Sequence, residues 1–469
     1  MLPSVSDGVD PASGLVPPAK PGVPLRTVCS TLLFLVTTLY LYSAHAQASG
    51  TDFSTALSQA VTTSSSAKAA RFERDAAIAR AERDRPVARP TIFANASGGV
   101  QGPRVNLPGM SPLTETVLPS ETGRVDLILE QQLYHPGVPA ARVRFRAELA
   151  LADIAYRKAL ASISLNVENL YLDLYKAQVG VKMATEGVVA ANSYCKLVDE
   201  TIASGVGKPV DRSSAAARLA EAQSVLISAQ SGVALAGMAL NRAVGKPLSS
   251  ANVETVLSLP KDVDGSELER AVAAARNRRA EVLEAVVGLS AARAGVKLAA
   301  SQSGPSVVAR GQLTEQTPTA LIHEHYASAT IEIHIPILDA QKTRIDTREA
   351  VAEVNRLQEM LQEAKSGVEL DVQRAWRKIA DARSKIELSR ARSLGSQATL
   401  TVAEAAYKAG RASAFELESA QREKRLSAES AIQAEVDLMA AYIDFKYAQG
   451  DAPETVQRAA PILNYSESW

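Results

Sequence analysis

Histidine and glutamate side chains gather in one segment of the chain where they could bind a metal ion. His323, Glu324 and His325 are consecutive, and His334 follows shortly after. Imidazole nitrogens and carboxylate oxygens are common ligands of divalent metal ions. The consecutive residues fall in a segment predicted to be a surface loop, where solvated polar side chains are expected. The sequence therefore predicts solvated residues and no metal site here.

A glycine-rich segment, Gly205-Val206-Gly207-Lys208-Pro209, could suggest a phosphate-binding loop. Such a loop needs Ser or Thr after its lysine and an additional glycine earlier in the chain. Pro209 stands in place of the hydroxyl residue, and Ile202 in place of the first glycine. Because Gly permits a left-handed helix cap and Pro can start a helix, the segment instead predicts a break between two helices. No nucleotide or other cofactor is expected.

The sequence has no arrangement typical of an enzyme active site. We find no nucleophile–base motif and no cysteine ligand cluster among the 469 residues, and Cys195 lies in a helical apolar pattern that favours a small buried residue. Lys+Arg and Asp+Glu are 51 each, so the net charge is zero, which argues against nucleic-acid binding. Hydrophobic residues at 46% indicate a folded chain. We therefore expect no enzyme.

Residues 1–46 have the features of an export signal. Basic residues precede an apolar run from Thr27 to Tyr42, and Ala44-His45-Ala46 matches a signal-peptidase cleavage site. A membrane anchor is the alternative, because the apolar run is only slightly too short to span a bilayer. After residue 46, we expect no apolar run long enough to cross a membrane as a helix.

Heptad patterns predict two long helical hairpins, over residues 142–245 and 342–449. Apolar residues that alternate at spacings of three and four predict a coiled-coil seam. In the first long helix these are Leu160, Ile163, Val167, Leu170, Leu174, Ala177, Val181, Ala184, Val188, Ala191, Cys195, Val198 and Ile202. A helix from Arg142 to Ala203 would be ~93 Å long at ~1.5 Å per residue. No compact globular domain needs a helix of that length.

The two halves of the chain follow the same plan. A shift of 205 residues pairs Val167 with Val372, Tyr171 with Trp376, Gly205 with Gly410, Ala215 with Ala420 and Gly245 with Gly450. A shorter helix, about Phe53–Arg83 or Leu268–Ala299, precedes each hairpin. We therefore expect a signal peptide at 1–46, repeats at 47–250 and 251–450, and a C-terminal tail at 451–469.

Each repeat also holds two predicted strands, at about 91–100 and 124–133, and at about 306–313 and 329–337. Every odd position from Ile331 to Ile337 is isoleucine, which gives one apolar and one polar face. This pattern fits an ordinary half-buried sheet or a membrane barrel with a polar lumen, which His334 would face. The predicted export signal and the length of the helices favour the membrane barrel over the half-buried sheet. Four strands cannot close a barrel and lipid does not tolerate an open edge, so several chains must share it.

The order helix, strand, strand and long helical hairpin, stated twice, resembles the TolC-like outer-membrane efflux proteins over residues 51–450. The most specific motif is Tyr407-Lys408-Ala409-Gly410-Arg411-Ala412-Ser413-Ala414-Phe415-Glu416, and the starts of the long helices, Gln132-Leu133-Tyr134 and Ile335-Pro336-Ile337-Leu338-Asp339, also resemble the family. The resemblance implies a mainly α fold, and a homotrimer with a shared 12-stranded β-barrel in the outer membrane and a periplasmic α-barrel. It also implies a passive exit duct of a tripartite efflux or type I secretion system, docked on a periplasmic adaptor (membrane fusion) protein that serves an inner-membrane pump.

The resemblance implies a gate where the hairpin tips converge at the periplasmic entrance. Tyr407 and Asp211 match the gate tyrosine and aspartate of the family, and Glu416 occupies the acidic position that narrows the entrance. Arg411 lies one residue before the place of the family arginine, which here holds Ala412. We therefore expect a gate with altered hydrogen bonding.

The tip turns also resemble the short motifs that meet the adaptor, which implies contacts at Gly205-Val206-Gly207 and at Gly410. The alternative for Asp211 and Glu416 is that they begin helices, because negative charge is favourable near a helix N-terminus. That alternative explains the residue types without excluding a gate.

Two other classes of protein also use long helical hairpins. A periplasmic adaptor has one hairpin flanked by soluble β domains, whereas this chain has two hairpins and two alternating strand pairs. A structural coiled-coil spacer has no pore, and it leaves the isoleucine alternation at 331–337 unexplained.

Overall fold

The computed structural model describes residues 53–83, 85–86, 89–100, 102, 105–106, 116–118, 121–205, 207–247, 265–317, 323–337 and 340–459. The expected signal peptide and Val206 lie outside the described residues. The chain divides into Met1–Ser49 and Gly50–Trp469, and all described residues belong to the second unit.

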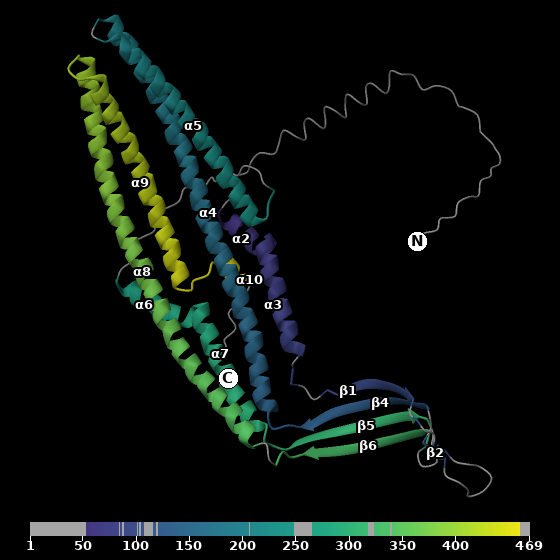
Figure 1. Cartoon of the computed structure of the whole chain (residues 1–469). Helices are drawn as coiled ribbons and strands as arrows, with labels where there is room; N and C mark the ends of the chain where they lie inside the picture. The colour runs from purple at the N-terminus through teal and green to yellow at the C-terminus, as the bar shows by residue number, and fades with distance from the viewer. Residues whose placement is uncertain are drawn as a thin grey trace, which may run out of the picture. The chain divides into compact units, whose positions relative to one another are not determined.

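Two long antiparallel helical hairpins dominate the second unit (Figure 1). The helices are α4 (Val138–Ala203) with α5 (Pro209–Val244), and α8 (Ala340–Lys408) with α9 (Ala414–Ala448). α4 has 66 residues and α8 has 69, so each spans ~100 Å at ~1.5 Å per residue. The fold is mainly helical with a small sheet, as predicted.

The shorter helix before each hairpin is broken into two, where the sequence predicted one. The four pieces are α2 (Phe53–Thr63), α3 (Ser65–Arg83), α6 (Gly265–Arg278) and α7 (Ala280–Ser301). Each break receives the end of a hairpin helix: Gly245, after α5, lies against Ser64, and Gly450, after α9, lies against Arg278 and Arg279. The chain after Gly450 forms a further short helix, α10 (Glu454–Ala459).

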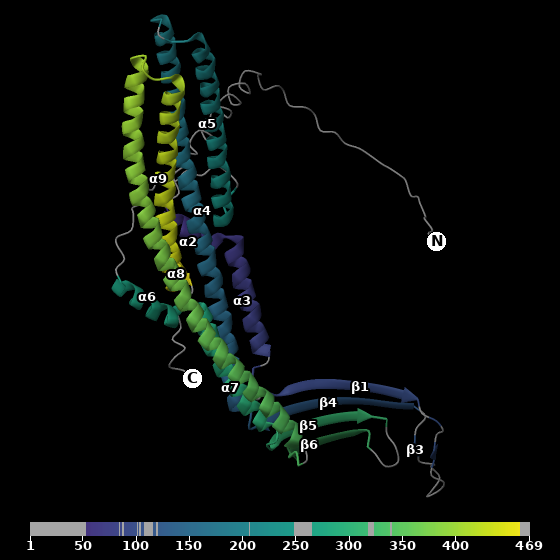
Figure 2. The ribbon, with the colours of Figure 1, turned by 60° about the vertical axis from the view of Figure 1, so that its left-hand side comes forward.

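The core along α4 has more than the one predicted contact face. Leu160, Val167 and Leu174 of the predicted seam are buried, but Tyr171 and Tyr194, which lie outside it, are buried as well. The Tyr171 ring packs edge-on against Phe53 of α2, with 5.0 Å between ring centroids. The additional face arises because α4 contacts α2, α3, α5, α7 and α9 on different sides. Figure 2 shows α4 running among these helices.

Four antiparallel strands form a sheet in the order β1-β4-β5-β6. They are β1 (Thr91–Val100), β4 (Glu121–Tyr134), β5 (Ser306–Gln316) and β6 (His325–His334). β6 ends at His334, earlier than the expected residue 337, because Pro336 has no N–H for the ladder. A short pair, β2 (Val105–Asn106) and β3 (Thr116–Leu118), lies in the segment between β1 and β4.

One expectation about membrane helices is wrong. By length and composition α5 could cross a membrane, since an 18-residue window has a mean hydropathy of 1.3. Only 11% of that window is buried inside the chain. α5 nevertheless pairs along α4 as half of a hairpin, so its apolar side chains are arranged for contacts between helices.

Candidate functional site

The two hairpin tips have turns of the same length, each with a glycine as its second residue. The first turn joins α4 to α5 through residues 204–208, and the second joins α8 to α9 through residues 409–413. Gly205 and Gly410 have φ values of +79° and +67°, in the left-handed region that favours glycine. Gly410 donates a 2.9 Å hydrogen bond to the Tyr407 carbonyl, and the Arg411 N–H donates one of 2.9 Å to Ala406. These bonds satisfy carbonyls that the helix end would otherwise leave unpaired.

Gly207 is required for a different reason, which is close packing of the backbone. Its N–H donates a 2.9 Å hydrogen bond to the Thr201 carbonyl. A Cβ at this position would lie 2.9 Å from the Ile202 nitrogen and 2.9 Å from the Thr201 Oγ1 atom. Any other residue would therefore push the turn away from the end of α4.

The two acidic gate candidates cap their own helices. The Glu416 carboxylate accepts a 2.8 Å hydrogen bond from the Ser413 N–H, and the Ser413 hydroxyl accepts one of 3.2 Å from the Glu416 N–H. The Asp211 carboxylate accepts a 3.3 Å hydrogen bond from the Lys208 N–H. Both acids thus satisfy N–H groups at a helix start and interact favourably with the helix dipole.

The other two gate candidates differ in their exposure. Tyr407 is buried, its ring centroid lies 6.3 Å from that of Tyr194, and its hydroxyl has no hydrogen-bond partner among the described residues. Arg411 is exposed in the turn. A single chain therefore does not bring the side chains of Tyr407, Asp211 and Arg411 into one hydrogen-bonded network within its described residues.

Arg218 joins the two hairpins near their tips. From α5, its guanidinium donates a 3.2 Å hydrogen bond to Gln421 and forms a 3.4 Å ion pair with Glu418, both on α9. Its Cζ atom lies 4.6 Å from the centroid of the Tyr194 ring. The Arg218 side chain is only 17% exposed, so water screens its charge less than at the surface. We call Tyr194, Arg218, Tyr407, Glu418 and Gln421 the tip contact.

The electrostatics of the tip contact favour a neutral Tyr194 hydroxyl. Burial and the neighbouring Tyr407 raise the pKa of Tyr194, and Arg218 opposes this shift. The sequence analysis missed Tyr194, Arg218 and Glu418 as partners. A signal was present, because Arg218 follows three alanines on a helix whose other face is apolar and Tyr194 precedes the seam residue Cys195.

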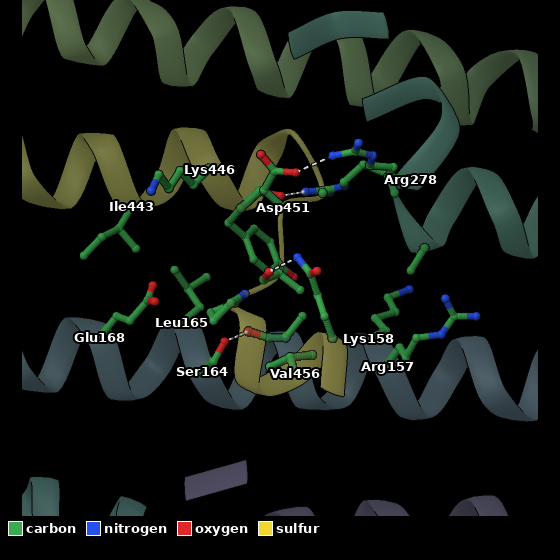
Figure 3. Close-up of a pocket in the computed structure, with 18 of the residues that line it drawn as sticks. Arg157, Lys158, Ser164, Leu165, Glu168, Arg278, Ile443, Lys446, Asp451 and Val456 are labelled. Carbon is green, nitrogen blue, oxygen red and sulfur yellow. Dashed lines mark hydrogen bonds and ion pairs between the residues drawn. The ribbon is translucent and has the colours of Figure 1, made fainter. Parts of the chain in front are cut away.

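An open cavity of about 960 Å³ lies at the opposite end of α9, where α9 ends beside the start of α7. Figure 3 shows Glu168 of α4 directed toward Ile443 and Lys446 of α9. Burial raises the pKa of Glu168 to about 7, although Lys446 lowers it in part. Beyond them, Arg278 forms a 2.6 Å ion pair with Asp451. We call this space the junction cavity.

The histidines do not come together. His325 begins β6 and His334 ends it, so a full strand separates them. The closest acidic contact is 3.9 Å, from His325 to Glu324, and His323 is exposed. No group of three or more His, Cys, Asp or Glu side chains in the described part of the chain could hold a metal ion.

Comparisons with known proteins agree with this architecture. The family described as outer membrane efflux protein matches residues 56–246 and 271–450. Protein CyaE of Bordetella pertussis is 27% identical over 271 residues, which cover 56% of each chain, so the match spans little more than half of that relative.

Solved structures share the fold at low sequence identity. CusC, described as forming a transmembrane channel, is 17% identical with a TM-score of 0.71, over 85% of this chain and 92% of CusC. VceC, an outer membrane protein of Vibrio cholerae, is 16% identical with a TM-score of 0.69, over 85% of this chain and 96% of VceC. CmeC, an outer membrane channel of Campylobacter jejuni, is 15% identical with a TM-score of 0.69, over 88% of this chain and 90% of CmeC.

Proposed function

The chain belongs to the outer membrane efflux protein family, and we propose that three copies of it form a passive export channel. The family gives the protein an outer-membrane location and a role in efflux. The channel has no catalytic step, so its work consists of assembly, gating and passage of solutes.

The observation that carries the proposal is the four-stranded sheet. Its apolar side chains Leu127, Leu129, Ile331 and Ile333 are all more than 40% exposed within one chain. A soluble sheet would bury these apolar side chains against a core. Because they are exposed in this chain, we expect lipid to cover this face of the sheet. In the described sheet, β1 and β6 each have one unpaired edge. Pairing β1 of one copy with β6 of the next closes a 12-stranded barrel and removes every edge from lipid.

The helical hairpins continue this channel into the periplasm, and their tips form its gate. Within one chain, Arg218 fastens the first hairpin to the second through Glu418 and Gln421. Opening requires the hairpins to separate, which breaks these contacts and exposes the buried Tyr407 ring. Asp211 and Glu416 place negative charge at the entrance, and their capping hydrogen bonds hold the two carboxylates in position. Arg411 projects from the second turn.

The partner at the tips is a periplasmic adaptor protein that links the channel to an inner-membrane pump of a tripartite efflux or type I secretion system. The turns around Gly205, Gly207 and Gly410 are suited to such a contact, because they expose backbone at the ends of both hairpins. Val206, which belongs to the same predicted contact, lies outside the described residues.

Single-channel recordings in a lipid bilayer test the gate. We expect low conductance for the wild type and a several-fold increase for Arg218→Ala, which removes the ion pair, the hydrogen bond and the stacking together. Arg422→Ala is the matched control, because Arg422 pairs with the same Glu418 but within α9, at 3.2 Å, and forms no ion pair with another element in the part of the chain that the structure describes. Asp211→Ala should raise conductance less than Arg218→Ala. Tyr407→Phe should raise it least, since its hydroxyl has no partner among the described residues.

Each result has a distinct meaning. Equal conductance for wild type, Arg218→Ala and Arg422→Ala would contradict the gate assignment and leave the proposed channel intact. If the wild type and the variants all insert into the bilayer without conducting, the proposed channel is wrong.

A further inference from the structure

Three charged side chains from adjacent strands form a cluster on the polar face of the sheet. Arg310 of β5 lies between Glu130 of β4, at 3.6 Å, and Glu332 of β6, at 3.1 Å. The cluster therefore crosses three of the four strands. Its side chains are between 37% and 51% exposed, so the charges are accessible to solvent rather than buried.

The strand register fixes which face carries these charges. Arg310 lies opposite Glu130 on one side and Thr330 on the other. The neighbouring positions, Ala309 and Ile331, point to the opposite face, because successive side chains in a strand alternate. That opposite face carries the exposed isoleucines and leucines. If this face meets lipid, as the proposed channel requires, the Arg310 cluster faces the lumen.

Among the described strand residues, the charges on this face do not cancel. Nearer the outer end of the sheet, Arg124 and Asp126 form a 2.8 Å pair that balances itself. In the cluster, Arg310 balances only one of its two acidic neighbours, so each chain keeps one carboxylate in excess. A lumen surrounded by low-dielectric lipid focuses such a field on any solute that passes.

We propose that the Glu130–Arg310–Glu332 cluster is an electrostatic filter that makes the barrel lumen favour cationic over anionic solutes. This inference rests on the proposed function, and it adds a charge class of substrate and the residues that select it. Arg310 sets the strength of the filter: it halves the acidic charge of the cluster while leaving the lumen negative. Its fixed position between two carboxylates keeps that charge at one depth in the lumen.

Charged thiol reagents measure the local potential without passing the gate. A Thr330→Cys reporter, directly across from Arg310, is introduced together with Cys195→Ser, which removes the one cysteine outside the expected signal peptide. Membrane-impermeant cationic and anionic methanethiosulfonates are then added outside intact cells at low ionic strength. The readout is the ratio of the cationic to the anionic modification rate.

We expect Arg310→Gln to raise this ratio at least ~3-fold, because a unit charge within several ångströms of the reporter is lost. Arg310→Lys is the matched control that keeps the charge, and it should leave the ratio within about 1.5-fold of the parent, since Coulomb energy depends on charge and distance. Replacing both acids, by Glu130→Gln and Glu332→Gln, should invert the preference. An unchanged ratio in Arg310→Gln, with Thr330→Cys fully reactive, would overturn the filter.

A second reporter separates this failure from failure of the channel. Ile331→Cys lies on the apolar face and should resist both impermeant reagents. Equal reactivity of Thr330→Cys and Ile331→Cys would overturn the barrel, and the filter with it. Reactive Thr330→Cys, resistant Ile331→Cys and no effect of Arg310→Gln would overturn the filter alone.

Discussion

The tip contact and the junction cavity lie at the two ends of α9, and they are built in different ways. At the tip, Arg218 places a cation against an aromatic ring and a carboxylate, and apolar residues fill the space around it. At the junction, the helices enclose about 960 Å³ of open space, and the half-buried Glu168 reaches into it toward Lys446. Side chains thus fill the space at the tip and leave a cavity at the junction.

This difference shows where single side chains matter most. A few polar contacts hold the tip together, so one substitution can release it. The junction has the Arg278–Asp451 ion pair and, in addition, a close backbone fit, because Gly450 lies directly against Arg278 and Arg279. The two regions therefore call for different kinds of perturbation.

Adding a methyl group at the turn glycines should affect the junction more than the tip. Gly450→Ala places a Cβ 3.1 Å from the Arg278 Cβ and 3.2 Å from the Arg279 nitrogen, at a φ of +76°. We expect a loss of roughly 2–4 kcal/mol, from strain and overpacking together. Gly205→Ala is the matched control, because its φ is +79° but nothing lies within 4 Å of the added Cβ, and it should cost only about 1–2 kcal/mol. Urea unfolding in detergent measures both, and equal losses would contradict the close fit at the junction.

A rise in pH from 4.5 to 8 should weaken the junction, whereas the Tyr194 hydroxyl of the tip contact stays neutral over this range because its pKa is raised above the ordinary value of 10. The folded-state pKa of Glu168 is raised from 4.5 to about 7, so its protonated form is stabilised by folding. That contribution to stability is complete below the unfolded pKa and is lost as pH rises from 4.5 through about 7.

Glu168→Gln isolates this effect, because glutamine keeps the shape and does not titrate. Its thermal midpoint, followed from pH 4.5 to pH 8, should fall less than that of the wild type. Glu186→Gln, at an exposed position on the same helix, is the control and should follow the wild type. Parallel curves for Glu168→Gln and wild type would show that the cavity hydrates the carboxylate.

Removing the caps of the two tip turns should change the free energy of unfolding only slightly. Ser413→Ala removes the hydroxyl that accepts the Glu416 N–H and should cost about 1 kcal/mol. Lys208→Ala removes a side chain that cannot accept a hydrogen bond, so stability should change by less than about 0.5 kcal/mol. The midpoint of urea unfolding is the measurement, and equal costs would mean that the Ser413 cap contributes nothing at the second tip.

The sequence predicted the parts of the fold that depend on local chemistry. Heptad spacing and the glycines at 205 and 410 indicated the hairpins, since left-handed turns and apolar seams follow from neighbouring residues. Alternation at Ile331 indicated one apolar and one polar face. The observed strands β4, β5 and β6 nevertheless extend further from the helices than predicted, and β6 ends earlier, at His334, because Pro336 has no N–H for the ladder. The sequence also offered the cap as an alternative for Asp211 and Glu416, and both side chains do cap helices.

Contacts between distant segments could not be predicted in this way. Arg218 meets Glu418 across 200 residues of sequence, and no local period connects them. The helix breaks at Ser64 and Arg279 arise because another helix ends against them, a tertiary effect that local propensity does not contain. For the same reason, the burial of Tyr194, which lies beside the predicted seam, could not be predicted from the sequence.

In the proposed channel, several copies of this chain share one membrane barrel. Cell fractionation, followed by size exclusion with light scattering on the detergent-extracted protein, tests this arrangement. We predict an outer-membrane particle whose protein mass corresponds to three mature chains. A soluble monomer or dimer would contradict the shared barrel and the export channel, and would leave an adaptor or a coiled-coil spacer as the function of the hairpins.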